Sequence, residues 1–252
     1  MGRQDSLIQL TGSIGNLSFY KSQDGYLARK KTGVSGSRVK SDAAFARTRE
    51  NIAEFSRAGQ ATRLVRTAFR SLLKSASDNR VTSRLVRGMM KVIQADAVNL
   101  RGQRNVIDGE AVLLEGFEFN SNGTLLKTFY APFTASIDRT TGTMIVDIPT
   151  FTPGDMISAP EGATHFRLKS SGAAIDFEGN TYSIAMSESA DLPISQEAQG
   201  PLQLSQTVAP GSVNPLFLIL GVEFLQLVNG AQYPLKNGAF NAMAIVKVDG
   251  GV

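Results

Sequence analysis

Eight basic residues stand at helical spacing along two stretches of the chain. Within each stretch the steps are three or four residues, so the four side chains project from one face of a helix. Each row is about 16 Å long at about 1.5 Å of rise per residue, and arginine suits bidentate contacts with phosphate or carboxylate oxygens. The first row is Arg63, Arg66, Arg70 and Lys74, and the second is Arg80, Arg84, Arg87 and Lys91.

Three interpretations of these rows stay open. They are a solvated helix face, a surface for an acidic protein, including the C-terminal half of another copy, and a surface that follows nucleic-acid phosphates. A solvated face usually mixes charges of both signs, yet Asp78 is the only acidic residue between Gln60 and Lys91. No aromatic residue interleaves with the rows, which argues against stacking on single-stranded bases.

Groups that could carry out catalysis or hold a metal are scarce. The chain has no cysteine and one histidine, which excludes thiolate nucleophiles, iron–sulfur clusters and His-rich metal sites. His165 stands at the start of a predicted strand and is interpreted as structural. Asp176 and Glu178 would share one strand face, where calcium binding or glycosidase chemistry is the alternative to solvated edge charges. Glu115 and Glu118 would lie on opposite faces. We expect no enzyme, no catalytic residue, no cofactor and no metal.

Charge is divided unevenly along the chain. The first 104 residues hold 20 basic and seven acidic residues, a net charge of +13. The remaining 148 residues hold six basic and 15 acidic residues, a net charge of −9, and the whole chain carries a net charge of +4. This division predicts two electrostatically opposite pieces. The cationic piece needs a polyanion, an acidic partner surface or the acidic half of a neighbouring copy.

The basic rows fall on predicted amphipathic helices. Apolar residues recur every three or four positions from Ser41 to about Ala97, which predicts two or three helices packed as hairpins. Ser41 and Asp42 offer N-cap chemistry, Gly59 predicts a break or kink, and residues 77–79 predict a turn. The two rows would therefore lie on neighbouring helices.

An arm precedes the helices. Residues 7–32 alternate and turn around glycine, and Asp24-Gly25 between extended segments predicts a β-hairpin. A hairpin with few large apolar residues is not stable alone, so it must lie on its own body or on another subunit. Residues 31–40 form a Gly/Ser/Lys linker. The residues assigned to the assembly arm are Leu10, Gly12, Ile14, Gly15, Leu17, Phe19, Tyr20 and Tyr26.

From Val106 onward the pattern has a period of two, punctuated by turn residues. About ten short strands at this spacing predict an antiparallel β-sandwich, with an immunoglobulin-like arrangement as one form of it. Residues 216–220 are apolar on both faces and predict either the central core strand or part of a subunit interface. The predicted strands are 111–119, 134–138, 143–148, 165–169, 173–177, 181–186, 202–207, 222–228, 232–235 and 242–248.

Three motifs near the N-terminus carry a resemblance. They are GSIGNLSFY at 12–20, DGYLAR at 24–29 and FARTREN at 45–51, with Glu54-Phe55 after them. The run resembles the opening of uncharacterised proteins of Bacteroidota and their mobile elements, over about the first quarter of the chain and loosely beyond it. The resemblance implies a bacterial source and a similar layout: a glycine-punctuated basic hairpin, an Arg-rich helical segment and a β-rich C-terminal half. It implies no activity, cofactor or functional residue.

Together these features predict an α+β protein in three segments. An N-terminal β-hairpin arm and linker occupy residues 1–40, a basic helical hairpin residues 41–104, and an acidic antiparallel β-sandwich residues 105–252. We expect a structural protein whose copies assemble head to tail, through complementary charge and an exchanged arm, into a ring, tube or filament. One alternative is a sequence-independent nucleic-acid-binding or packaging protein, phage-related proteins included. A lesser alternative is a carbohydrate- or surface-binding sandwich module.

The partners expected from the sequence are further copies of the chain or nucleic acid. No small-molecule substrate is evident. The longest apolar run, residues 216–228, is interrupted by Glu223 and Gln226 and falls short of the roughly 20 residues that span a bilayer, so no membrane span is expected. The N-terminus does not resemble a secretory signal, which predicts cytoplasmic synthesis and leaves the final location of an assembly open.

Overall fold

The structure is a computed structural model that describes residues 2–5, 8–31 and 33–251, without the side chains of residues 236 and 237. The chain has an α+β fold in which every strand pairing is antiparallel among the described residues. It divides into two compact units, Met1–Arg49 and Glu50–Val252. These bounds differ from the three segments expected from the sequence.

The first unit contains a small four-stranded sheet in the order β1-β4-β3-β2. The hairpin predicted at Asp24-Gly25 is confirmed, because β3 and β4 meet there and Gly25 has a φ of 106°. The linker predicted at residues 31–40 is wrong in part, since Ser35 caps the helix α1. The elements are β1 (Gly2–Arg3), β2 (Gly12–Ile14), β3 (Leu17–Ser22), β4 (Gly25–Lys30), α1 (Gly36–Ser41) and the 3₁₀ helix η1 (Ala43–Phe45).

The helical hairpin consists of α2 (Ala46–Ala68), the short α3 (Arg70–Leu73) and α4 (Val81–Gln94). The break predicted at Gly59 is wrong, because α2 runs through it; a glycine costs a helix only about 1 kcal/mol relative to alanine, which a long packed helix tolerates. The break falls at Phe69, whose fully buried ring lies between α2 and α3 in sequence. The turn predicted at residues 77–79 is confirmed, and Asp78 accepts the backbone N–H of Arg80 there.

Two antiparallel sheets form the rest of the second unit. The larger follows the order β12-β11-β7-β8, with β13 beside β11 and β9 beside β7, and the smaller follows β10-β6-β5. The two strands predicted at 165–169 and 173–177 are one strand. The larger sheet contains β7 (His165–Asp176), β8 (Thr181–Glu188), β9 (Leu192–Pro193), β11 (Leu216–Val228), β12 (Ala231–Pro234) and β13 (Ala242–Asp249). The smaller contains β5 (Thr134–Asp138), β6 (Thr143–Ile148) and β10 (Leu202–Thr207).

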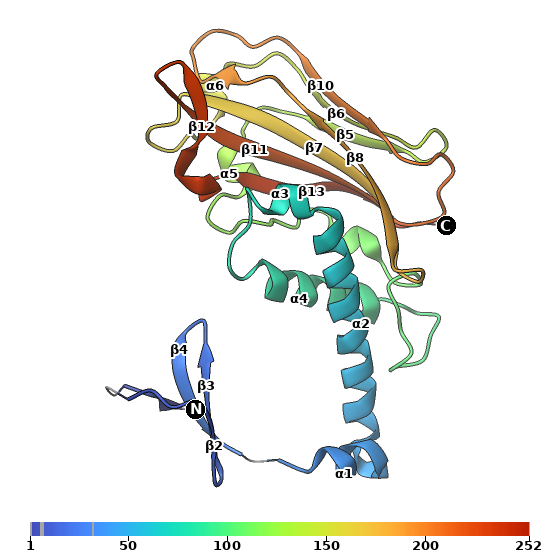
Figure 1. Ribbon diagram of the computed structural model, residues 1–252. Coiled ribbons are helices and arrows are strands. Elements are labelled where there is room, and N and C mark those ends of the chain that lie inside the picture. The colour runs from blue at the N-terminus through green and yellow to red at the C-terminus, as the bar shows by residue number, and fades with distance from the viewer. Residues whose placement is uncertain (1, 6–7, 32, 252) are drawn as a thin grey trace. The chain divides into compact units, whose positions relative to one another are not determined.

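The larger sheet is covered on both faces, with the helices α3 and α4 below it and the smaller sheet above it in Figure 1. Along β11, Phe217 and Ile219 pack in the core shared with the helices. Leu216, Leu218 and Leu220 pack in the core shared with the smaller sheet. The double-sided apolar run at 216–220 is therefore the central core strand, the first of its two predicted alternatives. The predicted sandwich-like α+β fold is confirmed.

The strand predicted at 111–119 is wrong. Ala111 and Leu114 are buried while the two residues between them are exposed, which is the spacing of a tight helical turn rather than of a strand. Residues 111–114 form the 3₁₀ helix η2 (Ala111–Leu114), and the chain then runs along β13, where Phe119 donates its N–H to the carbonyl of Met243. The remaining short helices are α5 (Leu125–Thr128), α6 (Pro153–Met156) and η3 (Leu235–Gly238).

Candidate interaction surfaces

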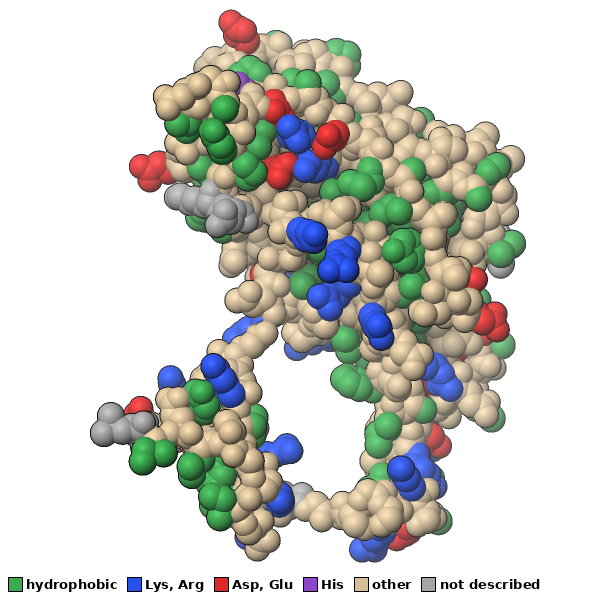
Figure 2. All heavy atoms as spheres, in the orientation of Figure 1, with side chains coloured by type: hydrophobic (Ala, Val, Ile, Leu, Met, Phe, Trp, Pro, Cys, Tyr) green, Lys and Arg blue, Asp and Glu red, His purple; other side chains and the backbone are tan. Residues whose placement is uncertain are grey.

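The first basic row lies on the exposed side of α2 and α3. The opposite side of these helices is buried against the larger sheet through residues such as Leu64, Val65 and Leu72. Figure 2 shows blue side chains gathered over this part of the helices. All four row members, Arg63, Arg66, Arg70 and Lys74, are exposed, and their side chains have no hydrogen bond or ion pair with any described residue.

The second row, on α4, is broken by Arg84. Its guanidinium donates to the carbonyls of Glu118 and Phe119, pairs with Asp78 and lies over the ring of Phe117. Burial opposes ionisation of Asp78, but backbone N–H donors and this guanidinium still lower its pKa. Arg84 is therefore a structural residue.

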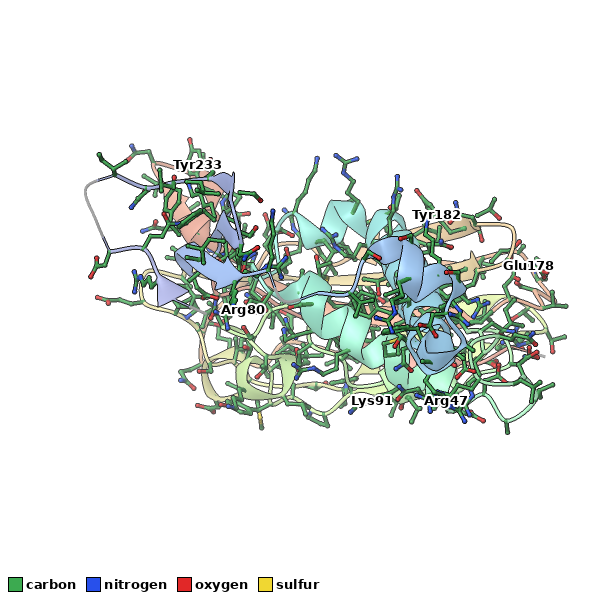
Figure 3. All side chains as sticks on the ribbon, turned by 90° about the horizontal axis from the view of Figure 1, so that it is seen from below. Arg47, Arg80, Lys91, Glu178, Tyr182 and Tyr233 are labelled. Carbon is green, nitrogen blue, oxygen red and sulfur yellow. The ribbon has the colours of Figure 1, made fainter. Side chains whose placement is uncertain are left out.

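The other members of the second row are exposed. Arg80 and Lys91 mark the two ends of α4 in Figure 3. The side chains of Arg87 and Lys91 have no polar partner among the described residues. Arg87 and Lys91 also line a shallow groove against η2, next to Leu113 and Glu115.

Most carboxylates of the acidic half bind groups within the same chain. Among the described residues, ten of its 15 carboxylates accept a hydrogen bond or form an ion pair; examples are Asp249 with Arg139 and Glu118 with the N–H of Leu125. Arg139 lowers the pKa of Asp249, and burial raises the pKa of Glu118. Five exposed carboxylates stay without such a partner: Glu110, Asp155, Glu161, Glu178 and Glu197.

Most of the residues considered for catalysis contact other groups of the described chain. His165 shares a hydrogen bond of 2.9 Å with the hydroxyl of Thr164. Asp176 accepts the N–H of Glu178 at 3.0 Å and so closes the β7–β8 turn, which means that the two carboxylates do not form a same-face pair. Glu115 pairs with Lys247. Within residues 2–5, 8–31 and 33–251, no group of three or more metal-ligating side chains comes together.

A cluster of charges that the sequence analysis missed lies on the helix side of the larger sheet. Lys169 binds Glu223 at 2.6 Å, and Arg167 binds Asp191 at 2.5 Å and Glu188 at 3.8 Å. The hydrogen bond from Asp191 raises the pKa of Arg167. Figure 2 shows red and blue side chains next to one another on the upper part of this face of the molecule. Cross-strand pairing brings them together, so spacing along one strand could not reveal them.

The loop between α4 and η2 is tied to both long helices. Asp96 accepts the backbone N–H groups of Val98, Asn99 and Asn105. Arg57 of α2 donates to the carbonyl of Gly102 at 2.6 Å, in the same loop. Burial opposes ionisation of Asp96, but the hydrogen bonds outweigh it and lower its pKa to about 2.

A cleft of about 750 Å³ lies between α2, residues 105–107 and the β7–β8 hairpin. Figure 3 shows Tyr182 beside α2, with Glu178 farther out on the hairpin. The cleft has an apolar wall that includes Leu64, Val106 and Phe177, while Arg63 lines another part. The sequence spacing could not predict this cleft, because three separate segments of the chain build it.

The predicted arm residues lie on the small sheet or next to it. Leu10 precedes β2 and is held by the amide of Gln4, and Gly15 lies in the β2–β3 turn at a φ of 53°. Tyr20 stacks with Arg29 on one face of the sheet. On the other face, strand pairing places four apolar side chains together, because opposite residues in antiparallel strands share a face. We call this set the arm face: Ile14, Leu17, Phe19 and Tyr26.

The comparisons with known proteins identify no relative: no family model, curated protein or solved structure matches the chain. The resemblance to Bacteroidota proteins therefore stays a prediction. Among the described helices, none is long and apolar enough to cross a membrane.

Proposed function

We propose that the chain is a structural protein whose copies assemble head to tail into a ring, tube or filament. An N-terminal arm docks on a neighbouring copy, and complementary charges orient the contact. The observation that carries this proposal is that none of the described residues of Met1–Arg49 is buried. The second unit, in contrast, holds two large apolar cores.

The arm has an apolar surface that needs cover. Leu10, Ile14 and Leu17 are 41%, 61% and 44% exposed. A sheet of such short strands is marginal on its own and gains stability by packing an apolar face against another surface. An arm of this kind typically adds strands to a partner, which supports an exchange between copies.

The charges that stay without partners also support a contact between copies. Six cations on α2–α4 lack a partner among the described residues, and they belong to the helical part of the chain. Two of the five unpartnered carboxylates, Asp155 and Glu197, lie on adjoining segments, since Gly154 donates to the carbonyl of Ser195 at 2.8 Å. Two different, complementary patches on one copy favour a heterologous contact, which closes into a ring or propagates.

The test of this proposal is the mass of the particle in solution. Light scattering of the full chain at about 50 mM salt, where screening is weak, should show species much larger than the 27.0 kDa monomer. Deleting residues 1–32 should leave a folded body with nearly unchanged circular dichroism and monomeric mass. A full chain that stays monomeric at every concentration contradicts the proposal, and so do assemblies that persist after the deletion.

The second candidate is sequence-independent binding of nucleic acid. It is favoured by the row Arg63, Arg66, Arg70 and Lys74, whose exposed side chains have no partner among the described residues. Such a row would bind DNA or RNA with steep salt dependence. Arg66→Glu should then weaken binding strongly, while Lys127→Glu, the same charge change on the exposed side of α5, should not. No binding at about 50 mM salt removes this candidate.

A further inference from the structure

We infer that the docking site for the arm is the open edge of β8, together with the adjoining cleft, on a second copy of this chain. This inference rests on the proposed function and names its receptor. In it, β2 of one copy pairs with β8 of the next, and the arm face covers the apolar wall of the cleft.

The strand β8 offers an unpaired edge. It pairs with β7 over eight residues, and no other described strand pairs with it. Edge strands are normally protected by lysine, proline, bulges or a covering segment. The sequence of β8, TYSIAMSE, has neither lysine nor proline, and Tyr182, Ser183 and Met186 are exposed. Such an edge is a template for strand addition.

The other borders of the two sheets are less suitable. Residues 116–119 cover the outer edge of β13, where Gly116 and Phe119 donate to the carbonyls of Ile245 and Met243. The edge strands β5 and β10 are shorter, with five and six residues, and the pocket beside them, lined by residues such as Phe133 and Leu202, is smaller at about 640 Å³. The strand β8, with eight residues, combines a longer open edge with the larger of these two cavities.

The arm presents matching parts. Its edge strand β2 is exposed throughout, so its outer backbone groups are accessible. Ile14 on β2 belongs to the arm face, with Leu17 and Phe19 beside it on β3. When β2 lies next to β8, this face can turn toward Tyr182, Leu64 and Val106 of the cleft. Burying these side chains supplies about 25 cal/mol per Å² of apolar surface.

Charge favours the same pairing. Residues 176–191, which contain β8, carry four acidic and no basic residues. Residues 2–31, which contain the arm strands, carry five basic and two acidic residues, a net charge of +3. Lys21 and Lys30 lie at the two ends of the arm face, Glu178 lies in the turn before β8, and Glu188 ends β8, where it also lies 3.8 Å from Arg167. Opposite charges at both ends of a pairing steer the encounter and fix its register.

The absence of cysteine allows a direct test. Two single-cysteine variants, Ser13→Cys on β2 and Ser183→Cys on β8, would carry different tags, be mixed at high salt, returned to low salt and treated with a short bis-maleimide. We expect a cross-linked product that contains both tags. The control pair replaces Ser183→Cys with Ser136→Cys on β5, also exposed, and should give little product.

A matched pair of edge substitutions gives a second readout. Ser183→Lys places a lysine on the β8 edge and should lower the assembled fraction by about tenfold. Ser205→Lys makes the same change at an exposed position of β10 and should leave assembly unchanged. Circular dichroism of both variants verifies the fold.

The outcomes separate this inference from the proposed function. If the full chain assembles but no cross-link forms between positions 13 and 183, the docking site is wrong and the proposed assembly is not affected. The same conclusion follows if both lysine variants change assembly equally. Cross-linking within one chain of a Ser13→Cys/Ser183→Cys variant, with no gain in mass, overturns the exchange between copies. A chain that never assembles overturns both.

Discussion

At the scale of single residues, the sequence predicted which side chains face away from the core better than it predicted which groups surround them. Helical spacing correctly placed Arg63, Arg66 and Arg70 on an exposed side, because the apolar residues between them had to face the core. The same spacing could not show that Arg84 differs from Arg87. Their difference depends on residues 117–119, which lie about 30 positions away in sequence and reach Arg84 only through the pairing of that segment with β13.

Arg84 and Arg87 therefore make a matched pair for a stability measurement. Arg84→Ala removes two carbonyl contacts and leaves the buried carboxylate of Asp78 without its cation, so it should lower the free energy of unfolding by about 2–3 kcal/mol. Arg87→Ala should change it by less than about 0.5 kcal/mol. Urea unfolding of both variants tests this difference. Equal effects would show that Arg84 is one more solvated cation.

Asp96 predicts a dependence of stability on pH. Its pKa falls from 3.8 to about 2 on folding, so its ionised form stabilises the protein above about pH 4, and this contribution is lost as the pH falls toward 2. Asp96→Asn should cost about 1–2 kcal/mol at neutral pH, because one amide oxygen cannot replace two carboxylate oxygens. The difference between wild type and variant should shrink between pH 4 and pH 2. A difference that stays constant over this range argues against the hydrogen-bonded carboxylate.

At the scale of elements, the sequence predicted well the strands that are bounded by turn residues. It did not predict the packing contacts between one layer and the next. The bounds of β5, β6 and β10 match the prediction, since alternation and glycine turns are local signals. The strand prediction at 111–119 failed because the buried residues Ala111 and Leu114 are three positions apart, which suits a helical turn. Leu114 packs against Gly88 of α4, and this contact with another element is not a local signal. The break expected at Gly59 failed for a related reason: packing of α2 outweighs the low helix propensity of one glycine.

The strand β11 predicts a gradient of stability along its length. Leu218 is fully buried between the helical layer and the smaller sheet, so Leu218→Ala should cost about 3–4 kcal/mol. Leu227, near the end of the same strand, is 45% exposed, and Leu227→Ala should cost less than about 1 kcal/mol. Thermal or urea unfolding compares the two variants. Similar losses would contradict the position of β11 as the central core strand.

At the scale of the whole molecule, the sequence showed how charge is divided along the chain. It did not show which charged groups are paired within the chain and which are left for a partner. Ten of the 15 carboxylates after residue 104 have a hydrogen bond or ion pair within the described chain, whereas six cations on α2–α4 have none. The acidic surface left for a partner is therefore smaller than the net charge of −9 suggests. Side-chain partners such as Arg139 with Asp249 are separated by 110 residues and emerge only from the fold.

This distribution predicts that assembly responds to salt. Contacts between exposed charges weaken as the Debye length falls from about 10 Å at 0.1 M salt to about 3 Å at 1 M salt. Light scattering should therefore show assemblies that dissociate as salt rises. Assemblies that grow with salt would indicate a contact held by apolar surface alone.

Electron microscopy of the purified, negatively stained full chain at low salt tests the central claim most directly. Because the proposed contact joins two different surfaces of one chain, it repeats from copy to copy. The account predicts regular particles, such as rings, tubes or filaments, which disappear when residues 1–32 are deleted. A uniform field of particles of monomer size at concentrations well above those used for light scattering would contradict it.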